Sequence, residues 1–165
     1  MVQKKICMLG AFAVGKTSLV TRFVDSSYSE KYHTTMGVRI EKKTLQLGGK
    51  KWHVIIWDLA GEDEFLQIRP SYLRGSSGYL PVADGTRRAT LEAAVKMQQR
   101  VRDSIGDVPF VLILNKSDLA DEWEVAERTI DALSKRGCSW LKASAKTSVG
   151  VEEAFFTLVG KMMEG

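Results

Sequence analysis

The sequence GAFAVGKT, residues 10–17, decides the fold of this chain. It fits the pattern G-x-x-x-x-G-K-[ST], follows the apolar run Ile6–Leu9 and precedes a segment with helical character, residues 18–24. A strand, a glycine-bounded loop and a helix are the context in which this pattern binds phosphate. The glycines permit a tight turn that points backbone N–H groups inward, and the helix N-terminus adds about half a positive charge there. The stretch therefore predicts a nucleoside triphosphate site.

The residues of this loop have separate predicted roles. We expect Lys16 to reach the β- and γ-phosphates, and the Thr17 hydroxyl to hold Mg²⁺. The residues expected to contact the nucleotide here are Ala13, Val14, Gly15, Lys16, Thr17 and Ser18. The pattern alone names neither the base nor the reaction.

The composition is that of an ordinary globular domain. The chain has 165 residues, of which 44% are hydrophobic and 27% charged, so residues 1–165 are expected to form a single domain with a sizeable core. The net charge of +4 is mild and the basic residues are scattered, which predicts a solvated surface and no nucleic-acid binding. Cys7 and Cys138 lie in apolar, strand-like contexts without a signal peptide, as in cytoplasmic proteins.

Attachment to a membrane has no visible signal in this sequence. No apolar run approaches the ~20 residues of a membrane span. We find neither a C-terminal cysteine for prenylation nor an N-terminal myristoylation pattern. Membrane contact is therefore expected only through a partner or through a longer form of the chain.

Hydrophobic patterning predicts an α/β fold with alternating strands and helices. The strands are expected at residues 2–9, 38–47, 51–58, 78–84, 110–114 and 139–143, and the helices at 16–25, 66–74, 89–105, 122–135 and 151–163. Gly48 and Gly49 predict a tight hairpin, and Pro81 predicts a bulge or local bend in its strand. The result is a P-loop NTPase fold with a six-stranded, mostly parallel sheet, one antiparallel edge strand and helices on both faces. Its ligand is expected at the carboxyl ends of the strands.

The third predicted strand ends in Asp58. A carboxylate at this point, beside a phosphate loop, is expected to organise Mg²⁺ through water. Gly61, three residues later, is expected to offer its N–H to the γ-phosphate. The tetrapeptide alone favours a simple Asp-containing turn, but the phosphate loop favours the metal site.

The fifth predicted strand ends in the sequence NKSD, residues 115–118. Asp118 can accept two hydrogen bonds from guanine, at N1–H and at the exocyclic amine, which adenine cannot supply. An adenine would leave the carboxylate unpaired, at a cost of several kcal/mol. Asn115 is expected to bridge the base and the phosphate loop, and the Lys116 stem to cover one face of the ring.

The sixth predicted strand leads into Ser144, Ala145 and Lys146. The Ala145 N–H can donate to guanine O6, which again rejects adenine because adenine has an amine there. Ser144 would brace the loop. A helix-capping loop is the alternative interpretation of this short pattern, but its position after the other motifs favours base recognition.

In this order, the motifs resemble the guanine-nucleotide-binding elements of the small GTPases of the Ras superfamily. The Rab branch is most similar, through IWDLAGE at residues 56–62 and YLRG at residues 72–75. The resemblance covers essentially the whole chain. It implies a monomeric G domain that binds GTP or GDP with Mg²⁺ in the cytoplasm, or peripherally at a membrane through a partner. It also implies effector, exchange and activating proteins that bind residues 28–40 and 59–74.

The resemblance assigns roles to further residues. Thr35 corresponds to the threonine that binds Mg²⁺ only when the γ-phosphate is present; Thr34 competes, but Met36 and Gly37 follow Thr35 as the family pattern requires. Tyr28 matches an aromatic residue that packs edge-on against guanine, with an exposed loop tyrosine as the alternative. A hydrophobic surface for effectors is implied at Ile40, Trp57 and Tyr72, although burial in the core is an equal alternative for Trp57.

Two departures from the family pattern concern catalysis. Glu62 stands where the family has a glutamine that orients the attacking water. An ionised Glu can accept but not donate, and it brings negative charge towards the phosphates. We therefore expect hydrolysis slowed by ~10-fold or more, unless a raised pKa makes Glu62 a general base. Phe12 replaces a small residue near the γ-phosphate and either excludes a partner's arginine, reshapes the pocket or covers the nucleotide; Arg39 and Arg69 are nearby candidates for an intrinsic arginine.

The sequence thus predicts a GTP-binding switch with a low intrinsic GTPase rate. Its expected catalytic residues are Lys16, Thr35, Gly61 and Glu62, and its metal ligands Thr17, Thr35 and Asp58. The alternative is a GTP-binding recruitment module that does not hydrolyse GTP. A P-loop kinase or ATPase is a third hypothesis, which the guanine-specific motifs argue against.

Overall fold

The computed structural model describes residues 2–25, 38–59 and 70–164. The strands in these ranges are β1 (Val2–Gly10), β2 (Val38–Leu47), β3 (Lys50–Leu59), β4 (Ser76–Asp84), β5 (Leu112–Asn115) and β6 (Trp140–Lys142). The helices are α1 (Lys16–Asp25), α2 (Pro70–Leu73), α3 (Arg88–Ile105), α4 (Glu127–Lys135) and α5 (Val151–Glu164), with a 3-10 turn η1 (Ala120–Glu122).

The strands form one mixed sheet in the order β2-β3-β1-β4-β5-β6. β2 and β3 pair antiparallel, and the other neighbours pair parallel. Gly48 and Gly49 join β2 to β3 with φ of 61° and 74°, a left-handed conformation that glycine adopts without a steric penalty. The predicted six-stranded sheet with an antiparallel edge strand is confirmed.

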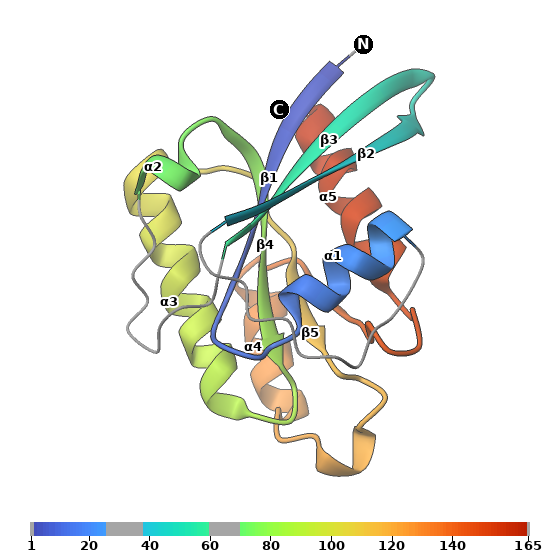
Figure 1. Cartoon of the computed structure of the whole chain (residues 1–165). Helices are drawn as coiled ribbons and strands as arrows, with labels where there is room; N and C mark the ends of the chain where they lie inside the picture. The colour runs from blue at the N-terminus through green and yellow to red at the C-terminus, as the bar shows by residue number, and fades with distance from the viewer. Residues whose placement is uncertain (1, 26–37, 60–69, 165) are drawn as a thin grey trace.

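Helices cover both faces of this sheet (Figure 1). α1 and α5 lie on one face, where Phe23 and Phe155 stack with their ring centroids 4.0 Å apart. α3 and α4 lie on the other face and pack Leu91 and Ile130 against buried residues of β5. β5 is buried on both faces, as its continuous apolar run predicts.

The predicted helix over residues 122–135 begins five residues later than expected. The chain first forms η1, and α4 starts only at Glu127. Between them the Glu124 N–H donates to the Gly85 carbonyl at 2.8 Å, and Val125 is buried. Packing against the loop after β4 therefore holds these residues out of the helix, although their local sequence favours it.

Pro81 does not produce the predicted bulge. The register shift between β1 and β4 lies between Ser76 and Gly78, and Pro81 pairs regularly with Leu9. Tyr79 directs its N–H and its carbonyl at the β5 side, so Pro81, two residues later, faces the same side without an N–H. Pairing between β4 and β5 is accordingly broken there: an isolated bridge at Tyr79 precedes the continuous ladder from Val82.

Other boundaries differ little from the predictions. β5 starts at Leu112 rather than at residue 110, and α2 covers only Pro70–Leu73 of the helix predicted over 66–74, whose first residues lie outside the described ranges. Within those ranges, no helix combines the length and the apolar character needed to span a bilayer.

Candidate nucleotide site

The predicted site residues that the structure describes gather at the carboxyl ends of the parallel strands. The loop after β1 turns at the same end of the sheet as the ends of β4 and β5 and leads into α1 (Figure 1). This is the place where open α/β sheets bind ligands.

The glycines of the phosphate loop lie too close to other groups to carry a side chain. A Cβ at Gly10 would lie 2.6 Å from the Val82 carbonyl oxygen, and one at Gly15 would lie 2.3 Å from Asn115 Nδ2. Gly15 also has a φ of 100°. The loop is therefore packed directly against the ends of β4 and β5.

Lys16 lies inside this loop with only 7% of its surface exposed. Its ammonium donates to the carbonyls of Gly10, at 3.1 Å, and Ala11, at 3.4 Å. Burial lowers the pKa of Lys16 to about 8, against the opposing effect of the Asp58 carboxylate. A buried cation whose pKa is lowered in this way is a site that an anion such as phosphate stabilises.

Thr17 and Asp58 meet beside this lysine. The Thr17 hydroxyl donates to Asp58 Oδ2 at 2.6 Å, and Asp58 is 1% exposed. Burial raises the pKa of Asp58, while the Thr17 hydrogen bond and the Lys16 charge lower it. The other carboxylate oxygen, Oδ1, is buried and has no hydrogen-bond partner within the described ranges. A hydroxyl and an unsatisfied carboxylate oxygen fit Mg²⁺, which prefers oxygen ligands.

Asn115 connects the phosphate loop to the loop after β6. It is 2% exposed, donates from Nδ2 to the Val14 carbonyl at 2.9 Å and accepts from the Ala145 N–H at 3.3 Å. The Ser144 hydroxyl donates to Asp118 Oδ1 at 2.7 Å. The residues predicted for base recognition are thus held together by direct hydrogen bonds.

Lys116 contacts the phosphate loop from the same strand end. It has a φ of 69°, which is uncommon for a residue other than glycine. Its ammonium donates to the Ala13 carbonyl at 3.2 Å and pairs with Asp84 Oδ2 at 2.9 Å. The left-handed backbone therefore accompanies a side chain that is tied to the loop.

Three residues of this region, Asp84, Arg87 and Arg22, are not among those predicted from the sequence. Asp84 ends β4 with 1% exposure and pairs with Arg87. An acidic residue at the end of a buried strand, the signal that singled out Asp58, marks Asp84 too. Arg22 donates to the carbonyls of Ala145 and Lys146, both at 2.8 Å, and braces the loop after β6. No local pattern identifies Arg22, because its partners lie more than 120 residues away.

Four of the predicted site residues, Tyr28, Thr35, Gly61 and Glu62, lie outside the described residues, as does Arg69. Ser18 is half-buried in the first turn of α1, and Lys146 is exposed. Phe12 is 53% exposed. Arg39 forms an ion pair with Glu41 at 2.8 Å.

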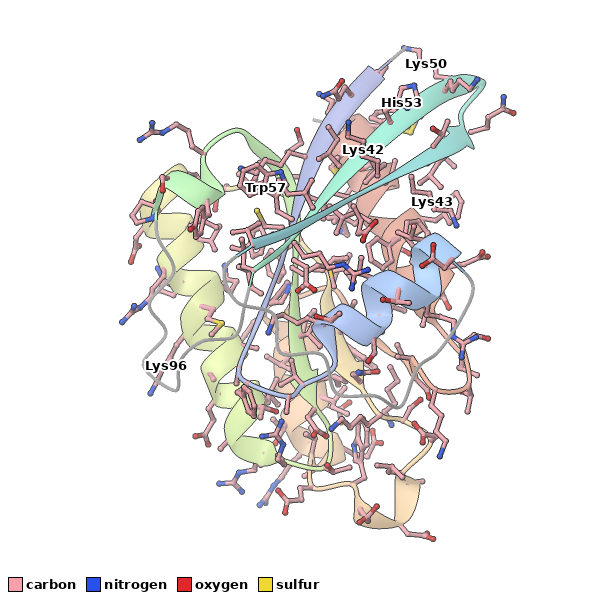
Figure 2. The ribbon with its side chains drawn as sticks, viewed as in Figure 1. Lys42, Lys43, Lys50, His53, Trp57 and Lys96 are labelled. Carbon is pink, nitrogen blue, oxygen red and sulfur yellow. The ribbon has the colours of Figure 1, made fainter. Side chains whose placement is uncertain are left out.

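Trp57 agrees in part with each of its two interpretations, an exposed hydrophobic surface and a buried core residue. It is half-buried, packs with the buried cluster beneath α2 and α3, and lies with its ring centroid 6.3 Å from that of Tyr72. The Lys5 ammonium lies 3.7 Å above its ring. Figure 2 shows Trp57 on the side of the sheet where α2 and α3 lie, with Lys42 and His53 further along the β2–β3 hairpin. On β2, Ile40 is 48% exposed.

Known proteins resemble this chain over nearly its whole length. The profile of the Ras family matches residues 5–164. The GTP-binding protein ypt1 of Schizosaccharomyces pombe is 36% identical over an alignment of 165 residues, and this alignment covers 97% of this chain and 80% of the relative. The Ras-related protein Rab-8B of Bos taurus is 34% identical over 161 residues, or 96% of this chain and 78% of the relative. The Ras-related protein Rab-1A of Dictyostelium discoideum is 36% identical over 161 residues, or 93% and 77%.

Proposed function

The chain belongs to the Ras family, and on that basis we propose that it is a GTP-binding switch that binds GTP or GDP with Mg²⁺ and hydrolyses GTP. The observation that carries this proposal is the meeting of Lys16, Asp58 and Asn115 at one end of the sheet, joined by hydrogen bonds to the phosphate loop and its flanks. Residues 1–165 act as one G domain in this proposal.

Guanine recognition rests on Asp118 and Ala145. The Asp118 carboxylate accepts from guanine N1–H and the exocyclic amine, while the Ala145 N–H donates to O6. Support comes from the hydrogen bonds that hold both residues in place, from Ser144 to Asp118 and from Ala145 to Asn115. Adenine has an acceptor at N1, no amine at C2 and an amine donor in place of O6, so it leaves these polar groups unpaired. Tyr28, Lys116 and Lys146 complete the base site in this proposal.

The phosphates occupy the phosphate loop, where Lys16 neutralises their charge. Thr17 and Asp58 hold Mg²⁺ together with Thr35, and this ion supplies further charge neutralisation at the β- and γ-phosphates when bound. Support comes from Oδ1 of Asp58, which is buried and has no hydrogen-bond partner among the residues that the structure describes. In the GTP state, Thr35 and Gly61 contact the γ-phosphate, and its loss releases both segments.

Hydrolysis is slow in this proposal because Glu62 replaces the glutamine of the family pattern. The water that attacks the γ-phosphate then lacks a side chain that both accepts from it and donates to the phosphoryl oxygens. Phe12 adds a second obstacle, since its half-exposed ring lies on the phosphate loop and can obstruct a partner's arginine. The same two residues favour the alternative, a GTP-binding recruitment module without turnover.

Partners are expected to bind residues 28–40 and 59–74. In the described parts of these segments, the exposed Ile40 and the half-buried Tyr72 supply apolar surface. The half-buried Trp57 adjoins them, since its ring lies beside that of Tyr72. We propose a monomer that meets effector, exchange and activating proteins there, in the cytoplasm or at a membrane through a partner.

Phosphate release separates these possibilities. Purified protein is loaded with GTP and Mg²⁺, and single-turnover release is followed for the wild type and for Glu62→Gln. A slow wild type with a variant about 10-fold faster supports a switch that waits for an activator. No release from either protein favours the recruitment module, and equal rates refute the role given to Glu62. Competition between GTP and ATP for the nucleotide-free protein tests the guanine preference.

A further inference from the structure

Three consecutive carbonyl groups of the phosphate loop are each held by a different side chain. The donors come from the end of β5 and from the residues that follow β4 and β5. Arg87 Nη2 donates to the Phe12 carbonyl at 2.9 Å, Lys116 Nζ to Ala13 at 3.2 Å and Asn115 Nδ2 to Val14 at 2.9 Å.

These contacts determine where the N–H groups of the loop point. In a planar trans peptide, the carbonyl of one residue and the N–H of the next point in opposite directions. Holding the three carbonyls towards these side chains therefore aims the N–H groups of Ala13, Val14 and Gly15 away from them. These are N–H groups to which the proposed function assigns phosphate binding.

Asp84 anchors two of the three donors. Its carboxylate is 1% exposed, and Oδ2 accepts from Arg87 Nε at 3.0 Å and from Lys116 Nζ at 2.9 Å. Oδ1 accepts from the N–H and the hydroxyl of Thr86 at 2.9 and 2.7 Å. Burial by itself raises the pKa of Asp84, but the hydrogen bonds from Thr86, Lys116 and Arg87 outweigh burial and lower it. The carboxylate therefore stays ionised where it holds both cations.

Arg87 suits its position because its guanidinium is a rigid, planar fork. Nε binds Asp84 while Nη2 binds the Phe12 carbonyl, so a single side chain joins the buried carboxylate to the loop. The next residue, Arg88, differs: its side chain is 69% exposed, and its closest ion-pair contact is Glu92 on the same helix at 3.8 Å. The two adjacent arginines thus offer a matched pair for experiment.

We propose that Asp84 and Arg87 are positioning residues for phosphate binding, which hold the Phe12 carbonyl towards Arg87 and thereby slow the release of bound nucleotide. This inference rests on the proposed function. Arg87 acts on the phosphates only through the backbone of the loop and does not itself touch them.

Nucleotide release tests this inference. The protein is loaded with a fluorescent GDP analogue in the presence of Mg²⁺. Excess unlabelled GDP is then added, and release of the analogue is followed. We expect release about 10-fold faster from Arg87→Ala, which loses a charge-assisted hydrogen bond to the loop. Arg88→Ala is expected to stay within about twofold of the wild type. Arg87→Lys should recover part of the loss, because an ammonium can make one of the two contacts.

A second measurement distinguishes positioning from a general effect on folding. The ³¹P resonances of bound GDP should shift in Arg87→Ala and not in Arg88→Ala, because only the former changes the N–H groups around the phosphates. Wild-type release rates in Arg87→Ala, or unchanged ³¹P resonances together with a lowered melting temperature of the nucleotide-free protein, would overturn the inference. A wild-type protein that retains no GDP analogue would refute the proposed function first, and this is seen before any variant is compared.

Discussion

Raising the pH is expected to stabilise the nucleotide-free protein through Lys16. Burial lowers the pKa of this side chain to about 8 from its ordinary value of 10.5. Between these two values, the unfolded chain binds a proton at Lys16 that the folded protein has released. The free energy of unfolding therefore rises with pH across this window, and below it the folded protein bears the full cost of a buried charge.

The size of the effect follows from the two pKa values. At about 1.36 kcal/mol for each pH unit between them, the whole window corresponds to about 3 kcal/mol, of which about 2 kcal/mol is recovered between about pH 7 and pH 9.5. Three other groups act in the opposite direction: burial raises the pKa of the Cys7 and Cys138 thiols and raises the pKa of Tyr79 to about 12. Their contribution must be subtracted.

Urea unfolding of the wild type is compared with that of Lys16→Met, without nucleotide or Mg²⁺. The difference in stability between the two proteins removes the contribution of the other titrating groups. The variant removes the charge and keeps a side chain of similar length, while Cys7, Cys138 and Tyr79 titrate equally in both proteins. We expect the stability of the wild type relative to the variant to rise by about 2 kcal/mol from about pH 7 to pH 9.5. If this difference in stability does not change with pH, the argument that burial lowers the pKa of Lys16 is refuted. With GDP bound, the phosphate charge should keep Lys16 protonated and abolish the rise.

Three further substitutions test the site and the core. Asn115→Ala removes two buried hydrogen bonds and leaves the Val14 carbonyl and the Ala145 N–H without these partners. We therefore expect the free energy of unfolding in urea to fall by about 2–4 kcal/mol and GDP release to become faster. Unchanged GDP release would contradict the bridging role. Thr17→Ala removes a hydroxyl from the expected metal site, so the Mg²⁺ concentration that half-maximally slows GDP release should rise about 10-fold, and an unaltered Mg²⁺ titration would count against that site. Phe155→Ala removes a fully buried ring and is expected to cost about 3–5 kcal/mol of stability. The half-buried neighbour Phe156 is the matched control. An equal loss of stability in Phe156→Ala would mean that the stacked Phe155 ring contributes no more to stability than its neighbour.

Local sequence determined the features whose physics is local. The bounds of α1 are those predicted, because a glycine-bounded turn leads directly into its first residue, Lys16. The hairpin between β2 and β3 follows from the conformational freedom of Gly48 and Gly49. The gathering of Lys16, Asp58 and Asn115 was also predictable, because parallel strands bring their carboxyl ends to one edge of a sheet.

Only the tertiary structure decided the features that depend on neighbours distant in sequence. α4 starts at Glu127 because Glu124 bonds to the loop after β4, which no helical periodicity encodes. Arg87 reaches the Phe12 carbonyl across 75 residues only because β1 and β4 are adjacent in the sheet. A charged residue near the start of a helix is ordinary in a sequence; its partner is set by strand order and packing, which arise from the whole chain burying its apolar surface at once.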